Sequence, residues 1–566
     1  MSDSTRSEGG PEGTVGRVLG TEDSTPLEFW VALQPGSVLQ LDDVVATERE
    51  VPGIGTVKVY GVVEQVRARH EGARYESDVF LIEDGLLPAA VVEAAKVVAT
   101  RFEPEVFVPP TPGSTVRKAA GIERDQALNF DGMARRLPAG LSRDGEPVHL
   151  DLDFVDGTKG AHVNISGISG VATKTSYALF LLHGLFAGGA LSHNDRALVF
   201  NVKGEDLLFL DRPNTQLSEV ERARYGALGL PAAAFASVAF FAPPRRGDPT
   251  GAVDTSARTA GVVPFFWTIA EFCHQDLLPF LFADAEDDRQ QFTIVIQNVL
   301  VRLREALDVG DGAASIEGVT VRTFDQLARA IADHLLDEGG VNSDWAGRAI
   351  GAGTVNAFIR RLYSAIPHLS HLVRADIRRA TASAIDPSQG QVTVVDVHNL
   401  NDRAQRFVVG VVVRQLFEQK EREGRAEPRQ VLVLDELNKY APRQGQSPIK
   451  EVLLDVAERG RSLGIVLIGC QQTASEVERR IVGNSSIRVV GRLDAAEAGR
   501  EEYGFLPLIQ RQRATILKPG TMIVGQPGLP VPLVVQFPFP AWATRAAEAA
   551  AAPDDGRDPF EVFSGR

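Results

Sequence analysis

Short β-branched runs separated by turn residues fill the first part of the chain. Between residues 15 and 108 they read VGRVLG, EFWVAL, VLQLDDVVATERE, TVKVYGVVEQVRARH, SDVFLIED and VVEAAKVVATRFEPEVFVP. Repeated strands at this spacing are typical of a small β-barrel. We therefore predict a barrel over residues 15–110, preceded by a polar lead (1–14) of disordered composition and followed by a Pro- and Gly-rich linker (111–147).

The hydrophobic pattern changes near residue 148, where apolar strands begin to alternate with helical segments. The strands read HVNISGIS, ALVFNVKG, VTVVDVHNL, QVLVLDELN, GIVLIGCQQ and IRVVGRL. Nearly continuous apolar strands between helices indicate a parallel sheet that is buried on both faces. Over residues 263–383 the period is helical instead, which predicts a helical insertion between two parts of an α/β core, 148–262 and 384–540.

The last residues, 541–566, form a predicted C-terminal tail with little packable pattern. Phe560, Val562 and Phe563 are its exceptions, and they indicate either a frayed end or a short docking motif for a partner. We therefore expect the folded part of the chain to end near residue 540.

Composition places the chain among water-soluble globular proteins. Its 566 residues predict three to four domains, and 44% hydrophobic with 23% charged residues argue against collagen-like, coiled-coil and disordered chains. The two cysteines, Cys273 and Cys470, exclude a disulfide framework or a zinc cluster and favour a reducing, cytoplasmic setting. The most apolar stretch, 177–191, is too short to span a bilayer, and the N-terminus lacks the apolar core of a signal peptide.

A Gly-rich loop follows the predicted strand VNIS and precedes an apolar helix. It reads GISGVATKTS and spans residues 167–176. In a phosphate-binding loop, glycines let backbone N–H groups face the phosphates, a lysine reaches the β/γ oxygens and a hydroxyl ligates magnesium. The candidate nucleotide ligands are Gly167, Gly170, Thr173, Lys174, Thr175 and Ser176. The loop is one residue longer than the usual spacing, and an ordinary strand-to-helix turn is the alternative.

Two carboxylates follow another predicted strand, since VLVL ends in Asp435 and Glu436. At such a place one acidic residue can hold the shell of a magnesium ion, and its neighbour can activate the attacking water. Because a buried strand does not tolerate unpaired carboxylates, this pair indicates a site at the carboxyl edge of the sheet. The alternative is a strand that simply ends in solvent.

Two further strand ends carry polar residues. They are Asn201, Lys203, Gly204 and Glu205 after one strand and Gln471 and Gln472 after the other. A glutamine in this position can sense a γ-phosphate or orient water, although each strand end taken alone is more often a turn. Four such ends at one edge of a parallel sheet predict a single site.

Three arginines complete the candidate chemistry. Arg459 and Arg461 precede the strand that ends at Gln471, and Arg488 follows the run VGNSSI. In ring ATPases such an arginine reaches the γ-phosphate of the neighbouring subunit and stabilises charge in the transition state. A solvated surface arginine is the alternative for each.

The ordered combination of these motifs resembles the HerA–FtsK class of hexameric ATPases, and HerA-like proteins in particular. The motifs are the N-terminal barrel, GISGVATKTS, FNVKGEDL, VLVLDELNKYAP, ERGRSLGIVLIGCQQ and NSSIRVVGRL, and the resemblance covers residues 15–540. It implies a HAS-type barrel, a RecA-like P-loop ATPase core with a helical insertion, ATP and Mg²⁺ as ligands, and a hexamer that threads DNA.

The same resemblance implies roles for individual residues. Lys174 and Thr175 match the Walker A lysine and hydroxyl, and Asp435 and Glu436 match Walker B. Gln471 matches the sensor, while Arg461, with Arg459 beside it, is the candidate arginine that acts on the neighbouring subunit. Two departures bear on the hydrolysis rate: the longer loop, and Asn201 where HerA-like proteins usually have aspartate before the Gly-Glu pair.

Net charge limits how the chain can meet DNA. The balance of 59 Lys+Arg against 74 Asp+Glu is −15, so any contact with a polyanion must be local. Lys439, Arg443 and Lys450 lie on the loop NKYAPRQGQSPIK after the Walker B strand, where they could follow DNA phosphates in a central pore. A merely solubilising loop is the alternative.

The sequence therefore predicts a cytoplasmic, Mg²⁺-dependent ATPase that forms a homo-hexameric ring and moves double-stranded DNA, without a membrane partner. The resemblance implies a nuclease partner in DNA end processing or an effector subunit in phage defence. A nucleotide-binding scaffold that hydrolyses ATP slowly or not at all is the second hypothesis. A folded α/β protein without an ATP site is the third.

Overall fold

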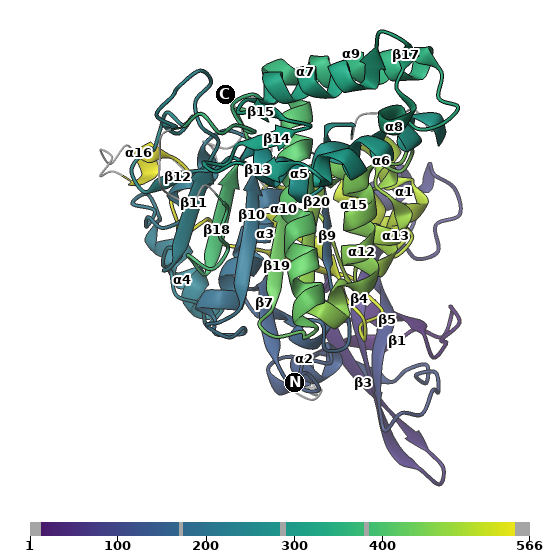
Figure 1. The fold of residues 1–566 in the computed structure, drawn as a ribbon. Helices are drawn as coiled ribbons and strands as arrows, with labels where there is room; N and C mark the ends of the chain where they lie inside the picture. The colour runs from purple at the N-terminus through teal and green to yellow at the C-terminus, as the bar shows by residue number, and fades with distance from the viewer. Residues whose placement is uncertain (1–12, 169–173, 283–289, 378–383, 550–566) are drawn as a thin grey trace, which may run out of the picture.

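The fold is taken from a computed structural model, which describes residues 13–168, 174–282, 290–377 and 384–549 (Figure 1). An N-terminal barrel, drawn in purple, lies beside a large α/β part in which helices pack on a long central sheet. The predicted fold class, a small β-barrel followed by an α/β core with an insertion, is confirmed. In the described parts of the chain, no helix combines the length and the apolar character needed to cross a membrane.

The barrel is closed, with its strands in the order β1-β2-β5-β4-β3-β6 and every neighbouring pair antiparallel. Its strands are β1 (Thr14–Val18), β2 (Glu28–Leu33), β3 (Val44–Val51), β4 (Gly55–His70), β5 (Val91–Glu103) and β6 (Thr115–Lys118). Alternating residues such as Val57 and Val59 on β4 are fully buried and fill its interior. Closure between β1 and β6 leaves no open sheet edge.

Two segments of the barrel region differ from the prediction. SDVFLIED, expected as a strand, contains the short helix α1 (Asp78–Glu83), because its apolar residues do not alternate and the Asp78 carboxylate accepts backbone N–H groups of Arg74 and Tyr75. The segment 111–147, expected as a linker, supplies β6, the helix α2 (Ile122–Ala127) and β7 (Arg136–Leu141), the last of which joins the central sheet.

The central sheet, as far as the described residues show it, has twelve strands in the order β12-β11-β18-β10-β19-β20-β9-β21-β22-β23-β7-β8. Pairing is parallel from β12 to β21 and antiparallel from β21 to β8. Besides β7, the strands are β8 (Pro147–Asp151), β9 (Val163–Ser166), β10 (Arg196–Asn201), β11 (Val238–Ala242), β12 (Val262–Pro264), β18 (Val392–Asp396), β19 (Gln430–Leu434), β20 (Ile465–Gln471), β21 (Ile487–Val490), β22 (Thr521–Gly525) and β23 (Leu533–Gln536).

Both faces of the parallel strands are buried, as their continuous apolar sequences predict. On β10, Leu198 and Phe200 enter one hydrophobic core, and Ala197 and Val199 enter the other. The helices of this part are α3 (Lys174–Ala187), α4 (Glu219–Ala227), α10 (Asp402–Glu423), α11 (Leu437–Tyr440), α12 (Pro448–Leu463), α13 (Arg479–Asn484), α14 (Ala495–Ala498), α15 (Leu508–Ala514) and α16 (Ala546–Ala549). α3 contributes to one core, and α10 and α12 to the other.

The predicted insertion is mainly helical, and α7 and α9 lie across the top of the view in Figure 1. Its elements are α5 (Ile269–His274), α6 (Gln290–Arg304), β13 (Leu307–Asp308), β14 (Ala314–Ile316), β15 (Val319–Val321), α7 (Phe324–Leu335), β16 (Leu336–Asp337), β17 (Gly340–Val341), α8 (Ser343–Ala346) and α9 (Ala352–Leu369). Ile331 of α7 and Phe358 of α9 belong to the same core as Phe407 of α10. The insertion therefore packs onto one face of the sheet.

The beginning of the predicted tail is part of the folded structure. Trp542 is fully buried, with its ring 5.3 Å from that of His183 and 5.0 Å from that of Phe235. The backbone N–H of Ala543 donates to the carbonyl of Arg212 at 2.8 Å. The described fold therefore includes residues 541–549, whereas Phe560, Val562 and Phe563 lie outside the described residues.

Candidate functional site

Four neighbouring strands bring the predicted polar ends together. β10, β19, β20 and β9 are adjacent and parallel, so their carboxyl ends lie at one edge of the sheet. The chain leaves these ends at Asn201, Asp435, Gln472 and Gly167. A parallel sheet places ligands outside the carboxyl ends of its strands, so this edge is the candidate site.

Thr175 and Asp435 join the first turn of α3 to the end of β19. The Thr175 hydroxyl donates to the Asp435 carboxylate at 2.8 Å, although the two residues are far apart in sequence. Gly167 packs against the neighbouring strand end, because an added Cβ would lie 3.3 Å from the carbonyl oxygen of Arg492. Ser176 is half-buried in the first turn of α3, and Gly170 and Thr173 lie outside the described residues.

Lys174 begins α3 and is buried, with 4% of its surface exposed. Its ammonium has no hydrogen-bond partner among the described residues. Burial lowers the pKa of Lys174, and the nearby carboxylates of Asp435 and Glu436 oppose that shift. A buried cation without a partner is costly, so this position suits an anionic ligand.

Glu436 is held in an unusual backbone conformation at the end of β19. Its φ of 56° and ψ of 44° are left-handed, which non-glycine residues rarely adopt and which is common at functional positions. Its carboxylate forms an ion pair with Lys203 and accepts a hydrogen bond from the Gln472 amide at 3.4 Å. Burial would raise the pKa of Glu436, but the ammonium groups of Lys203 and Lys174 hold it below its ordinary value.

Gln471 does not face Glu436. Its side-chain amide is fully buried and donates to Asn164 Oδ1 and Ser166 Oγ of β9, each at 2.7 Å. Side chains alternate along a strand, so the next residue, Gln472, is the one that reaches Glu436. Gln471 therefore joins β20 to β9, and Gln472 is the glutamine that contacts Glu436.

Glu205, which the sequence predicts to bind nucleotide, has its carboxylate hydrogen-bonded to a neighbouring loop. Its carboxylate accepts hydrogen bonds from the backbone N–H and hydroxyl of Ser256, at 2.6 and 2.7 Å, and from the backbone N–H of Ala257. Burial would raise the pKa of Glu205, but these hydrogen bonds lower it. Glu205 therefore positions the loop after β10.

Asn201 contacts a buried acid–imidazole pair that the sequence did not reveal. Its side-chain amide donates to Asp396 Oδ1 at 2.7 Å, and Asp396 also accepts from Nδ1 of His398 at 2.9 Å. Burial raises the pKa of Asp396, and the contact with Asp396 raises the pKa of His398. With Asn201 in the place of an aspartate, β10 can donate to the carboxylate at the end of β18.

Arg459 and Arg461 lie at the opposite edge of the sheet, near the C-terminal end of α12 and before β20 begins. Arg461 donates to the carbonyl oxygens of Gly157 and Thr158, each at 3.0 Å. Arg459 is exposed and pairs with Glu421. Neither arginine contacts the strand-end site of its own chain, so their action on a neighbouring subunit stays a prediction.

The three residues predicted to bind DNA all have protein partners. Lys439 pairs with Asp402 at 2.5 Å, and Arg443 pairs with Glu502 at 3.0 Å. Lys450 is 2% exposed, and its ammonium contacts the Glu478 carboxylate at 2.9 Å and two backbone carbonyl oxygens. Lys450 is therefore not available to a DNA backbone in this structure.

Replacing Lys450 with methionine is expected to destabilise the fold by about 3 kcal/mol, because the Glu478 carboxylate would keep only the exposed Arg480 beside it and two backbone carbonyl oxygens would lose their donor. The free energy of unfolding from a denaturant titration measures this. Lys439→Met is the matched control, and its more exposed pair with Asp402 should contribute less than about 1 kcal/mol. Unchanged stability together with weaker DNA binding in Lys450→Met would contradict the structural role.

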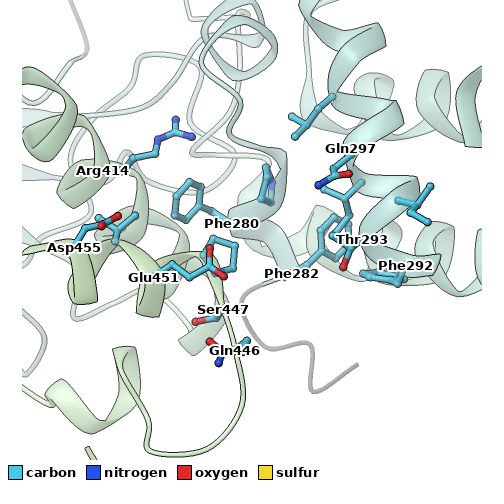
Figure 2. A pocket seen from close by; sticks show the side chains of 16 residues that line it. Phe280, Phe282, Phe292, Thr293, Gln297, Arg414, Gln446, Ser447, Glu451 and Asp455 are labelled. Carbon is cyan, nitrogen blue, oxygen red and sulfur yellow. The ribbon is translucent and has the colours of Figure 1, made fainter. Parts of the chain in front are cut away.

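An apolar cavity of about 680 Å³ lies elsewhere, between the insertion and the helices α10 and α12. Figure 2 shows the rings of Phe282 and Phe292 on one side, the polar Glu451 and Asp455 of α12 on the other, and the ring of Phe280 between them. None of the residues that form the strand-end site lines this cavity. Among the described residues that line it, Arg414 is the cation, and it donates to backbone carbonyl oxygens of Gln275 and Asp276.

No known family model matches the chain, and neither does any curated protein. The bacterial conjugative coupling protein TrwB is similar in structure, with 14% identity over 75% of this chain and 95% of that chain and a TM-score of 0.45. VirB4 of Thermoanaerobacter pseudethanolicus has 15% identity over 71% and 96%, with a TM-score of 0.43. TrwB has also been solved with ADP and Mg²⁺ (14% identity, 73% and 94%, TM-score 0.44). Because these TM-scores lie below 0.5, we base the function on the side chains described above.

Proposed function

We propose that this protein is a Mg²⁺-dependent ATPase whose copies form a ring that moves double-stranded DNA. One observation carries the proposal: the Thr175 hydroxyl and the Asp435 carboxylate meet at 2.8 Å beside the buried ammonium of Lys174. A loop lysine and hydroxyl at the start of a helix, facing an acid at the end of a neighbouring strand, form the nucleotide site of P-loop ATPases.

The donor set fits both ligands. The Lys174 ammonium, which is without a partner among the described residues, would hold the β- and γ-phosphates. Thr175 and Asp435 offer the oxygen atoms that Mg²⁺ prefers. When bound, Mg²⁺ neutralises charge on the phosphates.

Hydrolysis requires a base beside the γ-phosphate, and Glu436 has that place. Water attacks the γ-phosphorus, the bond from that phosphorus to the β,γ-bridging oxygen breaks, and the Glu436 carboxylate takes the water proton. The products are ADP and phosphate. The Glu436 carboxylate lies near enough to Lys174 for that ammonium to lower its pKa, and its left-handed backbone is of the kind that clusters at active sites.

The ring and its DNA rest on the resemblance to HerA-like proteins and on charge. A chain with a net charge of −15 needs a local basic surface, and Lys439 and Arg443 remain the candidates if their ion pairs open on DNA binding. In a hexamer, Arg461 or Arg459 would reach the site of the neighbouring subunit. A nuclease or phage-defence effector as partner, and a cytoplasmic location, belong to the same proposal.

A scaffold that binds nucleotide and hydrolyses it slowly is the second candidate, and one contact favours it. Lys203 neutralises Glu436, and a carboxylate engaged by an ammonium is a poor acceptor for a water proton. If Lys203 kept this place with ATP bound, turnover would be slow.

The test is ATP turnover by the full chain with and without linear double-stranded DNA, together with particle mass in solution. A motor should form particles of about six subunits and hydrolyse ATP severalfold faster with DNA. Tight ATP binding without turnover in either condition would support the scaffold. Absence of ATP binding would overturn both.

A further inference from the structure

We propose that Lys203 distinguishes ATP from ADP: its ammonium pairs with Glu436 while no γ-phosphate is present and moves to the γ-phosphate when ATP binds. This inference rests on the proposed ATPase function and adds a catalytic residue to it. The contact that carries it is the ion pair between Lys203 and Glu436 at the carboxyl ends of β10 and β19.

The Lys203 ammonium lies beside both carboxylates of the site. It contacts Glu436 and is 3.7 Å from Oδ2 of Asp435, the same oxygen that accepts the Thr175 hydroxyl. Lys203 and Thr175 therefore contact the same Asp435 oxygen, which places the Lys203 ammonium near the first turn of α3, where we expect phosphate to bind. Burial would lower the pKa of Lys203, but Asp435 and Glu436 raise it, so the group is charged at neutral pH.

The backbone around Lys203 is fastened on both sides. Before it, the Asn201 side-chain amide donates hydrogen bonds to Asp396 of the neighbouring strand and to the Gly204 carbonyl. After it, the Glu205 carboxylate accepts hydrogen bonds from the backbone N–H groups of Ser256 and Ala257. The base of the side chain is therefore fixed, and a change of partner needs only rotation about side-chain bonds.

The Lys203 side chain is half-exposed, so solvent is available for it to change its rotamer. It is 51% exposed, whereas the Glu436 side chain is 18% exposed and held by its backbone. A triphosphate placed at Lys174 adds strong negative charge next to Glu436, which repels that carboxylate and attracts the mobile ammonium. Once Lys203 has moved, the Glu436 carboxylate can accept a hydrogen bond from water.

ADP lacks the terminal phosphate, so the two nucleotides should differ in what they offer Lys203. With ADP, the ammonium keeps its pair with Glu436, and its removal leaves affinity almost unchanged. With ATP, removal costs a charge-assisted hydrogen bond to phosphate. Lys174, in contrast, serves a phosphate common to both nucleotides.

The experiment compares the dissociation constants of ADP and a non-hydrolysable ATP analogue, with Mg²⁺, for the full-length wild-type chain, Lys203→Ala and Lys203→Gln. We expect both variants to bind the ATP analogue at least about tenfold more weakly, equivalent to about 1.4 kcal/mol, and ADP within about twofold of wild type. Lys96→Ala is the matched control, because Lys96 bridges Glu28 and Glu64 on the barrel and should change neither constant.

Two results would overturn the inference. Equal affinity changes for both nucleotides would give Lys203 no preference for the γ-phosphate. If the variants kept the wild-type preference between the ATP analogue and ADP but hydrolysed ATP faster, Lys203 would only restrain Glu436 and would not contact the γ-phosphate. A wild-type chain that binds neither nucleotide would instead refute the proposed function, whereas normal ADP binding with unaltered selectivity in the variants refutes this inference alone.

Discussion

Lys174→Ala is expected to weaken ATP and ADP binding by about 100-fold or more and to reduce turnover to background. The ammonium is buried at the start of α3 and has no partner among the described residues, so phosphate would be its main counter-charge. Loss of one preorganised donor at a water-excluded site costs about 10²–10³-fold. Equilibrium binding of a fluorescent nucleotide and steady-state phosphate release measure the two effects.

Lys159→Ala is the control for this variant. Lys159 is also a lysine with two carboxylate neighbours, Asp151 and Asp153, but it is half-exposed and precedes β9 at the opposite edge. It should leave nucleotide binding unchanged. Retention of ATP affinity within about twofold in Lys174→Ala would show that the loop before α3 does not bind phosphate.

Glu436→Gln is expected to slow hydrolysis by about 10²–10³-fold while ATP stays bound. The amide keeps the shape of the side chain and can still contact Gln472, but it cannot take the proton of the attacking water. Burst measurements of phosphate release, combined with ATP binding, separate the chemical step from affinity. Glu22→Gln, at the ion pair with Arg67 in the barrel region, is the matched control.

The same variant distinguishes the two proposed functions. A motor that depends on turnover should lose DNA-stimulated hydrolysis and DNA movement together. A scaffold should keep ring assembly and its cellular role. Normal turnover in Glu436→Gln would instead mean that another group activates the water.

Much of the fold follows from short-range pattern. Continuous apolar runs such as the one in β19 predict strands buried on both faces, and the polar residues after them predict the edge where Asp435 and Glu436 lie. The strand β6 was missed because it is short and follows Pro and Gly, and β7 was missed because it contains Pro138 and Gly140; pairing with distant strands stabilises both. Helix α1 was missed because its run of apolar residues, including the exposed Val79, Phe80 and Leu81, has the composition of a short strand.

The sequence pattern predicts that Asp435 and Thr175 lie at one edge of the sheet, but it does not predict the hydrogen-bond and ion-pair partners of the site residues. The sequence places Lys450 on a loop as a cation for DNA, but its ammonium pairs with Glu478, which lies on a different segment. Gln471 and Gln472 are chemically identical, and only strand pairing decides which one faces Glu436. The motif FNVKGEDL contains Lys203 but does not predict its role, because its contact with Glu436 depends on β10 and β19 being neighbours.

The sheet also limits how the chain can be shortened or joined to another protein. A fragment that began at β9 would lose β7 and β8, and β23 would become an open edge able to pair with other chains. A fragment that ended at residue 540 would remove Trp542 from the rings of His183 and Phe235. Truncated versions meant for crystallisation or for fusion to a reporter should therefore keep residues 136–549 intact.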